Sequence, residues 1–217
     1  MNRDQRILII QKKLDYLYPK PNIPLIHLNN FTLLVAVVLS AQSTDKKVNE
    51  LTTILFKKAS DPKTMYELGE QNIYSYIKEL GLSKQKAKYL EKLSKKIYEQ
   101  FDSTVPDNFT DLESLDGVGH KTASVVMAQA FGIPTFPVDT HIHRLAQRWE
   151  LTNGKNVKQT EYDLKKIFPK EYWNKLHLQI IYYGREYCTA RGCYGIKCEL
   201  CKELFPNRKS PYKHKKA

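Results

Sequence analysis

The chain has 217 residues, 41% of them hydrophobic, so it can bury a core as one domain or two small ones and is not a disordered protein. Its 35 Lys and Arg residues against 23 Asp and Glu give a net charge of +12, which favours a polyanionic partner such as DNA, RNA or an acidic membrane surface. No apolar run has the length of about 20 residues that spans a bilayer, and the first residues lack the apolar stretch of a signal peptide. We therefore expect a cytoplasmic, nucleoid-associated protein with no membrane partner.

Most of the chain has helical periodicity. After a candidate capping residue, Asn30, apolar residues recur at helical spacing from Phe31 to Leu39 and predict a buried central helix. Further helices are expected at residues 48–58, 73–80, 84–101, 120–131, 141–147, 159–167 and 173–185. No segment shows the alternation of a half-buried strand, so the predicted fold class is all-α.

A glycine hairpin joins two of the expected helices. Thr110 and Glu113 have capping-box spacing and predict that a short helix begins there. Gly117 and Gly119 would then turn the chain into the helix that begins at His120. The first N–H groups of a helix lack partners within it, so beside small residues they can hold a phosphate without reading bases. Because Gly-x-Gly before a helix is also common as a plain turn, this motif alone does not establish DNA binding.

Lys121 follows this hairpin, and Asp139 lies a short way along the chain. A neutral lysine amine can form an imine with a sugar aldehyde, but free lysine has a pKa of about 10.4 and is almost fully protonated at neutral pH. The positive end of a helix dipole and burial under a substrate would both lower that pKa. Asp139 could accept the amine's proton and stabilise positive charge on a sugar. The residues alone leave an alternative, in which Lys121 is a surface cation and Asp139 only caps the next helix.

All four cysteines lie near the end of the chain, at Cys188, Cys193, Cys198 and Cys201. Such clustering predicts a metal site, not a scattered disulfide framework. Four thiolates can hold a tetrahedral zinc ion or a four-iron, four-sulfur cluster, and spacing discriminates poorly between them.

Other polar residues have weaker interpretations. His141 and His143 are expected to be structural, because their spacing directs them to different sides of a helix. The tail at residues 208–217 has five Lys or Arg and no acid, and we expect it to be mobile. It would either attract phosphate without specificity or be a solvated basic end without a specific role.

Taken in order, these motifs resemble the helix-hairpin-helix DNA glycosylases over nearly the whole chain, and most closely the members that also cleave abasic sites. The residues that carry the resemblance are Leu39 to Asp45, Gly81-Leu82, Gly117 to Ala123, Val138 to His141 and Gly184-Arg185. The resemblance implies two helical domains. One is a six-helix barrel at residues 22–133, with the helix-hairpin-helix at about 110–131. The other combines residues 1–21 with 134–217 and contains an iron–sulfur cluster and the basic tail.

The implied activity is base-excision repair of duplex DNA by a monomer. DNA would enter between the two domains, with Lys121 and Asp139 on opposite walls. Lys121 would attack C1′ of an oxidised pyrimidine nucleotide, expel the base and form a Schiff base, after which β-elimination breaks the strand. Asp139 would assist the attack and the departure of the base. Relatives that remove adenine differ at the lysine position, so Lys121 argues for lyase activity.

Chemistry at C1′ requires the nucleotide to leave the stack, at a cost of a few kcal/mol. The resemblance implies that Leu82 enters the duplex as an apolar wedge and that Gln42 fills the gap opposite the orphaned base. The hairpin residues Gly117, Val118, Gly119 and His120 would hold the DNA backbone.

The cysteine spacing departs from the pattern of this family, which is Cys-x6-Cys-x2-Cys-x5-Cys. Here the intervals are x4, x4 and x2. The ligand count survives, so a [4Fe-4S] cluster is expected, with zinc as the second possibility. Its distance along the chain from Lys121 predicts a structural role.

Two rival functions are compatible with the sequence. The first is a noncatalytic helix-hairpin-helix protein with a metal-bound end, which would bind DNA with strong salt dependence and no turnover. The second is a monofunctional glycosylase in which Asp139 activates water and Lys121 is incidental. Substitution of Lys121 separates these rivals from the lyase.

Overall fold

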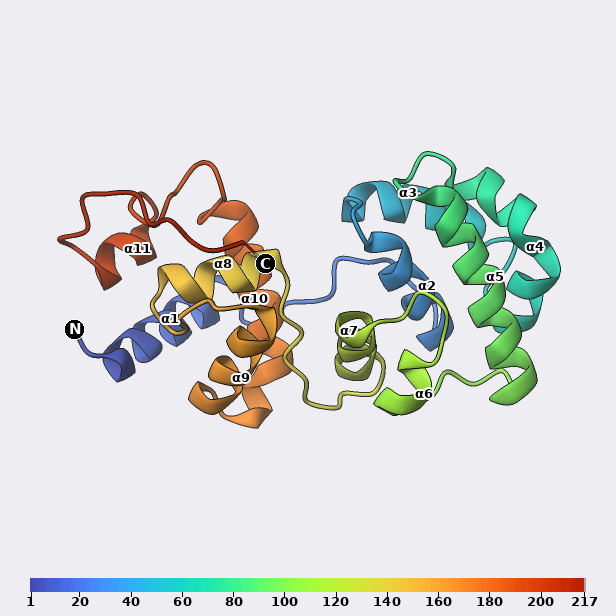
Figure 1. Cartoon of the computed structure of the whole chain (residues 1–217), viewed down its shortest axis with the longest axis horizontal. Helices are drawn as coiled ribbons and strands as arrows, with labels where there is room; N and C mark the ends of the chain where they lie inside the picture. The colour runs from blue at the N-terminus through green and yellow to red at the C-terminus, as the bar shows by residue number, and fades with distance from the viewer. Residues whose placement is uncertain (217) are drawn as a thin grey trace. The chain divides into compact units, whose positions relative to one another are not determined.

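Helices form all the regular structure of residues 1–216, the part of the chain described in the computed structural model (Figure 1). No strand occurs in those residues, so the all-α prediction is confirmed. The chain divides into two compact units. We call Ile23–Ile133 the central unit, and Met1–Asn22 together with the chain from Pro134 onward the terminal unit.

The central unit contains helices α2 to α7. Their bounds are α2 Asn30–Ser40, α3 Asp45–Leu55, α4 Pro62–Ile77, α5 Ser83–Gln100, α6 Phe109–Glu113 and α7 His120–Ala130. Every residue of α2 from Phe31 to Leu39 is buried, which confirms the predicted buried central helix. Its capping residue is Asn29 and not Asn30, because the Asn29 side chain accepts a hydrogen bond from the backbone N–H of Thr32.

Two helices of the central unit begin earlier than predicted. Thr44 caps α3, which therefore starts at Asp45 and not at residue 48. Asp61 caps α4 and Pro62 occupies its first turn, where a missing N–H costs nothing. Gly69, with φ of +76°, interrupts α4. This kink breaks the apolar periodicity, and the sequence therefore indicated only the second half of the helix.

The predicted capping box at Thr110 and Glu113 is wrong. Asn108 caps α6 instead, since its side chain accepts a hydrogen bond of 3.0 Å from the Asp111 N–H. The Asn108 amide also donates to the Asp111 carboxylate at 2.8 Å. These two contacts start the helix before Thr110 and leave the Glu113 side chain available for another partner.

The terminal unit has its own core and helices. Their bounds are α1 Arg3–Leu17, α8 Thr140–Arg148, α9 Val157–Ile167, the 3-10 helix η1 Lys170–Tyr172, α10 Trp173–Glu186 and α11 Glu199–Leu204. The sequence predicted α8, α9 and α10 but not α1 or α11. Only Ile10 and Leu14 are buried on α1, which is too few to produce a clear apolar stripe.

The basic tail lies against the terminal unit, contrary to the expectation of a mobile end. The Tyr212 N–H donates to the Tyr194 carbonyl at 2.8 Å. Gln147 and Lys215 exchange two hydrogen bonds, of 3.1 and 2.8 Å, between the Gln147 amide and the Lys215 backbone. Ala217 lies outside the described residues.

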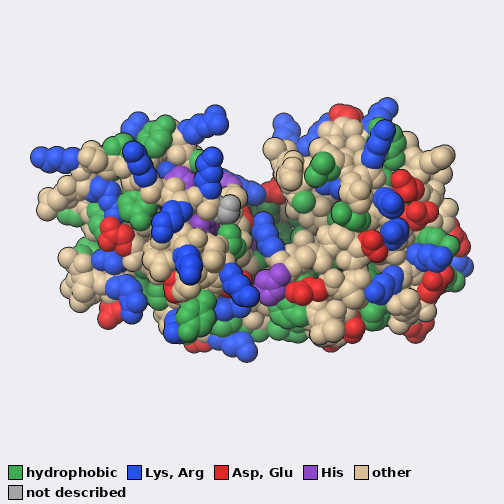
Figure 2. Space-filling model, in the orientation of Figure 1, with side chains coloured by type: hydrophobic (Ala, Val, Ile, Leu, Met, Phe, Trp, Pro, Cys, Tyr) green, Lys and Arg blue, Asp and Glu red, His purple; other side chains and the backbone are tan. Residues whose placement is uncertain are grey.

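Basic side chains are widespread on the surface. Each unit carries lysine and arginine on the face drawn in Figure 2, while acidic side chains are more frequent over α4 and α5. Among residues 1–216, no helix has both the length and the apolar character needed to cross a membrane.

Candidate active site and cysteine cluster

The turn between α6 and α7 is a tightly packed hairpin. The Leu115 and Val118 side chains are buried, and the Val118 N–H donates to the Leu115 carbonyl at 3.1 Å. Gly117 has φ of +79°, and a Cβ placed there would lie 2.7 Å from the Tyr89 ring. Glycine at this position is therefore required both by the backbone conformation and by the close approach of α5.

Gly119 differs from Gly117 because it has open space beside it. It is the N-cap of α7, with extended backbone and no side-chain cap. A Cβ built on Gly119 would meet no atom within 4 Å, so the chain around it leaves open space beside the start of α7. The N–H groups of a first helical turn have no partners within the helix, and this opening lets an anion reach them. Since the Val118 side chain is buried, only its main chain is available to a ligand.

Side chains from α5 and α6 brace the hairpin. His120 stacks on Phe109 with ring centroids 5.3 Å apart, and its Nδ1 lies 2.9 Å from Glu113 Oε1. Lys96 donates to the Ser114 carbonyl at 2.9 Å. The hairpin is thus fixed before any ligand binds.

Lys121 is the second residue of α7, and its side chain is exposed. It sits directly after the open start of the helix, where a phosphate on the N–H groups would bring a neighbouring sugar close to the amine.

Asp139 belongs to the terminal unit and is half-buried. Its Oδ1 accepts a hydrogen bond of 2.8 Å from the Ile142 N–H, so Asp139 does cap α8. The cap holds the carboxylate through Oδ1 and does not use Oδ2. Capping and chemistry are therefore compatible in this residue.

A polar chain runs from the Asp139 segment to the cysteines. Arg144 Nη2 lies 3.2 Å from His141 Nδ1 and donates to the carbonyls of Gly184 and Cys188 at 2.9 and 3.2 Å. A Cβ on Gly184 would lie 3.2 Å from both Arg144 and His141, which explains the glycine of the Gly184-Arg185 motif. Burial lowers the pKa of His141 and the Arg144 charge lowers it further, while Asp139 opposes both.

His143 lies on a different side of α8. Its Nδ1 is 2.8 Å from the Thr160 hydroxyl within the core, and burial lowers its pKa. This arrangement supports the structural role expected for His143, whereas the contacts of His141 reach Arg144 and Gly184.

Gln42 and Leu82 share an unusual backbone. Both have left-handed φ, +55° and +58°, although neither is glycine, and both side chains are exposed. Leu82 is 59% exposed, which excludes a core role. A Cβ on Gly81 would lie 3.6 Å from the Gln42 carbonyl oxygen, so the two loops are neighbours. Non-glycine residues in this conformation cluster at functional sites.

The sequence did not single out Lys86, which lies behind these loops. It is 3% exposed, and its Nζ donates to the Leu39 carbonyl at 2.9 Å and to the Ser43 hydroxyl at 3.0 Å. Burial lowers the pKa of this amine. A buried lysine inside an apolar helical pattern gives no signal of its own, because exposed lysines surround it on α5.

The four cysteines form a candidate metal site. Their Sγ atoms all lie within 4.8 Å of one another, and those of Cys188 and Cys201 are 3.8 Å apart. Cys188, Cys193 and Cys201 are buried and Cys198 is half-buried. Mutual hydrogen bonds lower the pKa of Cys198 to about 7 and lower that of Cys193, while they raise the pKa values of Cys188 and Cys201. A set of four clustered cysteines is a metal-binding donor set.

Arg148 holds the loop that begins at Cys188, and sequence analysis also missed it. Its side chain is fully buried and donates to the carbonyls of Thr189 and Ala190 at 2.9 and 3.1 Å, and to Cys188 Sγ at 3.2 Å. The forked guanidinium suits several carbonyls at once. It also puts a positive charge beside a ligand thiolate.

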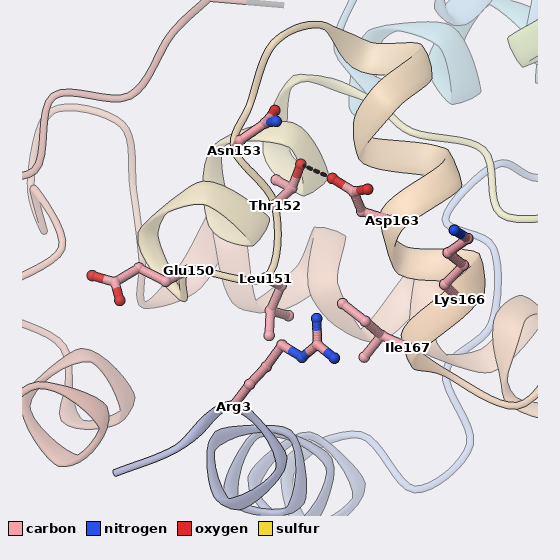
Figure 3. A pocket seen from close by; sticks show the side chains of 8 residues that line it. All are labelled: Arg3, Glu150, Leu151, Thr152, Asn153, Asp163, Lys166 and Ile167. Carbon is pink, nitrogen blue, oxygen red and sulfur yellow. Dashed lines mark hydrogen bonds between the residues drawn. The ribbon is translucent and has the colours of Figure 1, made fainter.

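One further hollow lies on the terminal unit, with a volume of about 340 Å³ (Figure 3). The Thr152 hydroxyl and Asp163 carboxylate are joined there at 2.6 Å. Arg3 and Lys166 share the lining with Glu150, so the hollow has no single sign of charge. It contains none of the predicted site residues.

Comparisons with known proteins agree on one family. The family model described as HhH-GPD superfamily base excision DNA repair protein matches residues 35–170. Endonuclease III of Treponema pallidum (strain Nichols) is 47% identical over 186 residues, covering 84% of this chain and 88% of that protein. Endonuclease III of Escherichia coli (strain K12) is 42% identical over 191 residues, covering 88% and 90%.

Solved structures give the same result. A trapped endonuclease III–DNA covalent intermediate is similar with a TM-score of 0.86 and 36% identity, covering 92% of this chain and 94% of that one. A non-covalent endonuclease III–DNA complex has a TM-score of 0.89 and 34% identity, covering 97% and 100%. The chain therefore belongs to the HhH-GPD superfamily of base excision DNA repair proteins and, within it, to the endonuclease III family.

Proposed function

We propose that this protein is a DNA glycosylase and abasic-site lyase that removes oxidised pyrimidines from duplex DNA. The observation that carries the proposal is the position of Lys121, an exposed amine one residue into the helix that the open glycine hairpin begins. The solved endonuclease III trapped covalently on DNA supports a covalent route in this family. The substrate also implies the location, which we propose to be the nucleoid.

In the proposed reaction, the central unit supplies the phosphate contact and the amine, and the terminal unit supplies the carboxylate. Main-chain N–H groups at Gly119 and His120 hold a phosphate, which positions the sugar at Lys121. The Lys121 amine bonds to C1′ as the bond from C1′ to the base breaks, and the departing base takes up the proton that the amine releases, by way of Asp139. The ring then opens to an imine, and loss of a C2′ proton expels the 3′ phosphate. Asp139 accepts the amine's proton and stabilises the positive charge on the sugar.

Exposed Leu82 and Gln42 are proposed to replace the displaced nucleotide. Leu82 enters as the wedge, and Gln42 offers its amide to the orphaned base. Their left-handed backbone and their adjacency support this role.

For the metal site we propose a [4Fe-4S] cluster on the four cysteines, as the family resemblance implies, with a structural role. All four donors are thiolates, which suits such a cluster. The short sulfur separations favour a second candidate, zinc, because four Zn–S bonds of about 2.3 Å place sulfurs about 3.8 Å apart in a tetrahedron. Metal analysis of anaerobically purified protein decides between them. About four irons and four sulfides per chain would support the iron–sulfur cluster. About one zinc per chain, without iron, would support the zinc site instead.

Borohydride trapping tests the catalytic proposal. The protein is mixed with a duplex that contains one abasic site, the imine is reduced, and the adduct is separated on a denaturing gel. Wild-type protein and the control Lys158→Ala, which loses an exposed lysine of α9, should give the adduct. Lys121→Ala should give none, and Asp139→Asn should form it at least about 100-fold more slowly.

The rival functions give different outcomes. A second duplex, which carries one oxidised pyrimidine, separates the rivals. On it a monofunctional glycosylase would release the base and leave the strand intact, and it would give no borohydride adduct. A noncatalytic DNA-binding protein would release no base, and Lys121→Ala would weaken its binding by a single phosphate contact. An adduct that persists in Lys121→Ala would overturn the assignment of the nucleophile.

A further inference from the structure

Lys86 is a buried cation without a carboxylate partner. Among residues 1–216 it is the only lysine classed as buried, and no ion pair involves it. Burying an unpaired ammonium is expensive, and burial indeed lowers its pKa. Methionine or leucine would fill the same space in a helical core without that cost. The position of Lys86 therefore suggests a role beyond packing.

Lys86 connects the two loops that carry Gln42 and Leu82. Its backbone N–H donates to the Leu82 carbonyl at 2.9 Å, which fixes the start of α5. Its Nζ donates to the Leu39 carbonyl at 2.9 Å and to the Ser43 hydroxyl at 3.0 Å. Leu39 precedes Gln42 and Ser43 follows it, so the Lys86 side chain holds both sides of the Gln42 loop. The Leu82 loop lies against that loop, because a Cβ on Gly81 would be 3.6 Å from the Gln42 carbonyl oxygen.

The Lys86 ammonium also donates a hydrogen bond to a backbone carbonyl in the last turn of α2. Leu39 lies in the last turn of that helix, where carbonyls lack partners within the helix and carry the negative end of its dipole. A lysine charge is favourable at that point. The three N–H donors of the lysine ammonium can bond to a carbonyl and a hydroxyl at the same time.

We propose that Lys86 is a positioning residue for insertion into DNA, holding Gln42 and Leu82 side by side in their left-handed conformations. This inference rests on the proposed function of those two residues. Left-handed backbone is disfavoured for residues that have a side chain, so loops without this tether would relax toward other conformations. Lys86 would thus act before chemistry, when the nucleotide leaves the stack, and not on the imine.

The test compares two substrates for Lys86→Met, which keeps the length of the side chain and removes its charge. On a duplex with one abasic site, single-turnover adduct formation should fall about 10- to 100-fold. On a single-stranded abasic oligonucleotide, where no duplex has to be opened, the rate should stay within about twofold of wild type. The matched control, Lys88→Met, removes an exposed lysine from the same helix and should leave both rates within about twofold.

A double-mutant cycle adds a readout that a general loss of stability would not produce. If Lys86 acts through Gln42 and Leu82, adding Lys86→Met to the pair Gln42→Ala and Leu82→Ala should lower the duplex rate by less than about twofold. Multiplicative losses would overturn the inference, as would equal losses on duplex and single strand. If Lys86→Met melts far below wild type, Ser43→Ala takes its place with an expected loss of about threefold on duplex only.

A binding assay separates this inference from the proposed function. A duplex with 2-aminopurine opposite a reduced abasic site reports insertion by fluorescence, without any chemistry. Wild type should change the fluorescence and Lys86→Met should require about tenfold more protein. If wild type gives this signal but no borohydride adduct, the lyase proposal fails and the inference on Lys86 stands. If both proteins give the same signal, the inference on Lys86 fails alone.

Discussion

The loops of the central unit and the cysteine loop of the terminal unit are held in different ways. In the central unit, the Lys86 side chain holds the exposed Gln42 loop, and Tyr89 fills the space under the glycine hairpin. Both residues come from α5, a long helix with its own apolar face. In the terminal unit, the chain after Cys188 is held by a buried arginine and carries four cysteines that could hold a metal ion. The central loops are therefore preorganised by the fold, and the proposed metal would add a cross-link to the cysteine loop.

The residues of α5 and the cysteine cluster are therefore expected to serve different purposes. Residues that insert into DNA or hold phosphate need a fixed geometry before binding, because ordering them on the DNA would reduce affinity. A segment with little apolar material needs a cross-link to remain folded, and a metal provides one. Changes at the two places should consequently affect different measurements.

Loss of one metal ligand should have the largest effect. We expect Cys201→Ser to lose the metal and to lower the protection of the terminal unit by at least about 3 kcal/mol, since metal binding contributes directly to folding. Hydrogen exchange followed by mass spectrometry measures this unit by unit. Peptides of the central unit are the internal control and should exchange as in wild type. An equal loss of protection in both units would show that the stability of the central unit also depends on the cysteine cluster.

The two hairpin glycines should separate stability from binding. Gly117→Ala places a methyl group 2.7 Å from Tyr89 at a positive φ, so we expect a loss of about 2–4 kcal/mol in the free energy of unfolding. Gly119→Ala has an ordinary φ and no close neighbour, so the free energy should change by less than about 0.5 kcal/mol. Its methyl group instead enters the space proposed for phosphate. Denaturant unfolding and DNA titration give both values for each variant.

If Gly119→Ala binds DNA as tightly as wild type, the prediction fails. The N–H groups at the start of α7 are then not the phosphate site. Unfolding of Gly117→Ala also lowers its apparent DNA affinity, so that affinity is compared after correction for the folded fraction at the assay temperature.

The sequence predicted the parts of this molecule that depend on local chemistry. The apolar stripe at 31–39, the glycine turn before α7 and the cysteine cluster can each be read within about fifteen residues of chain. Caps were misplaced at Asn30 and Thr110 because several Asn, Thr and Asp residues compete at each helix start. Helix α1 was missed because tertiary packing, not periodicity, stabilises it.

The supporting residues could not be predicted from local pattern. Lys86 bonds to the carbonyl of Leu39 and Arg148 bonds to that of Ala190, so each contact joins residues more than 40 positions apart in the sequence. Lysine and arginine on a helix are usually solvated, and only the three-dimensional arrangement shows that these two are buried. Gln42 and Leu82 were predicted from family resemblance, and their left-handed backbone supplies an independent physical reason to single them out.

The smallest expected effect concerns pH and lies within the terminal unit. Burial lowers the pKa of His143, and His214 and His141 on the same unit are shifted in the same direction. A histidine in the unfolded chain titrates at about 6.5, so below that pH the unfolded state binds more protons than the folded state. Stability is therefore unaffected well above pH 6.5 and falls as the pH drops through it, by up to about 1.4 kcal/mol per pH unit for each such histidine.

His143→Asn isolates this effect, because the asparagine amide can still donate to the Thr160 hydroxyl but does not titrate. Thermal unfolding at pH 8 should give melting temperatures for the two proteins within about 2 °C. At pH 5.5 the wild type should lose more of its melting temperature than the variant, by about 2–4 °C. Metal content is measured at each pH, because a loss of metal would lower both melting temperatures together. If the two proteins lose the same amount while retaining their metal, His143 does not couple folding to protonation, and the pH sensitivity of the terminal unit has to come from the other shifted histidines.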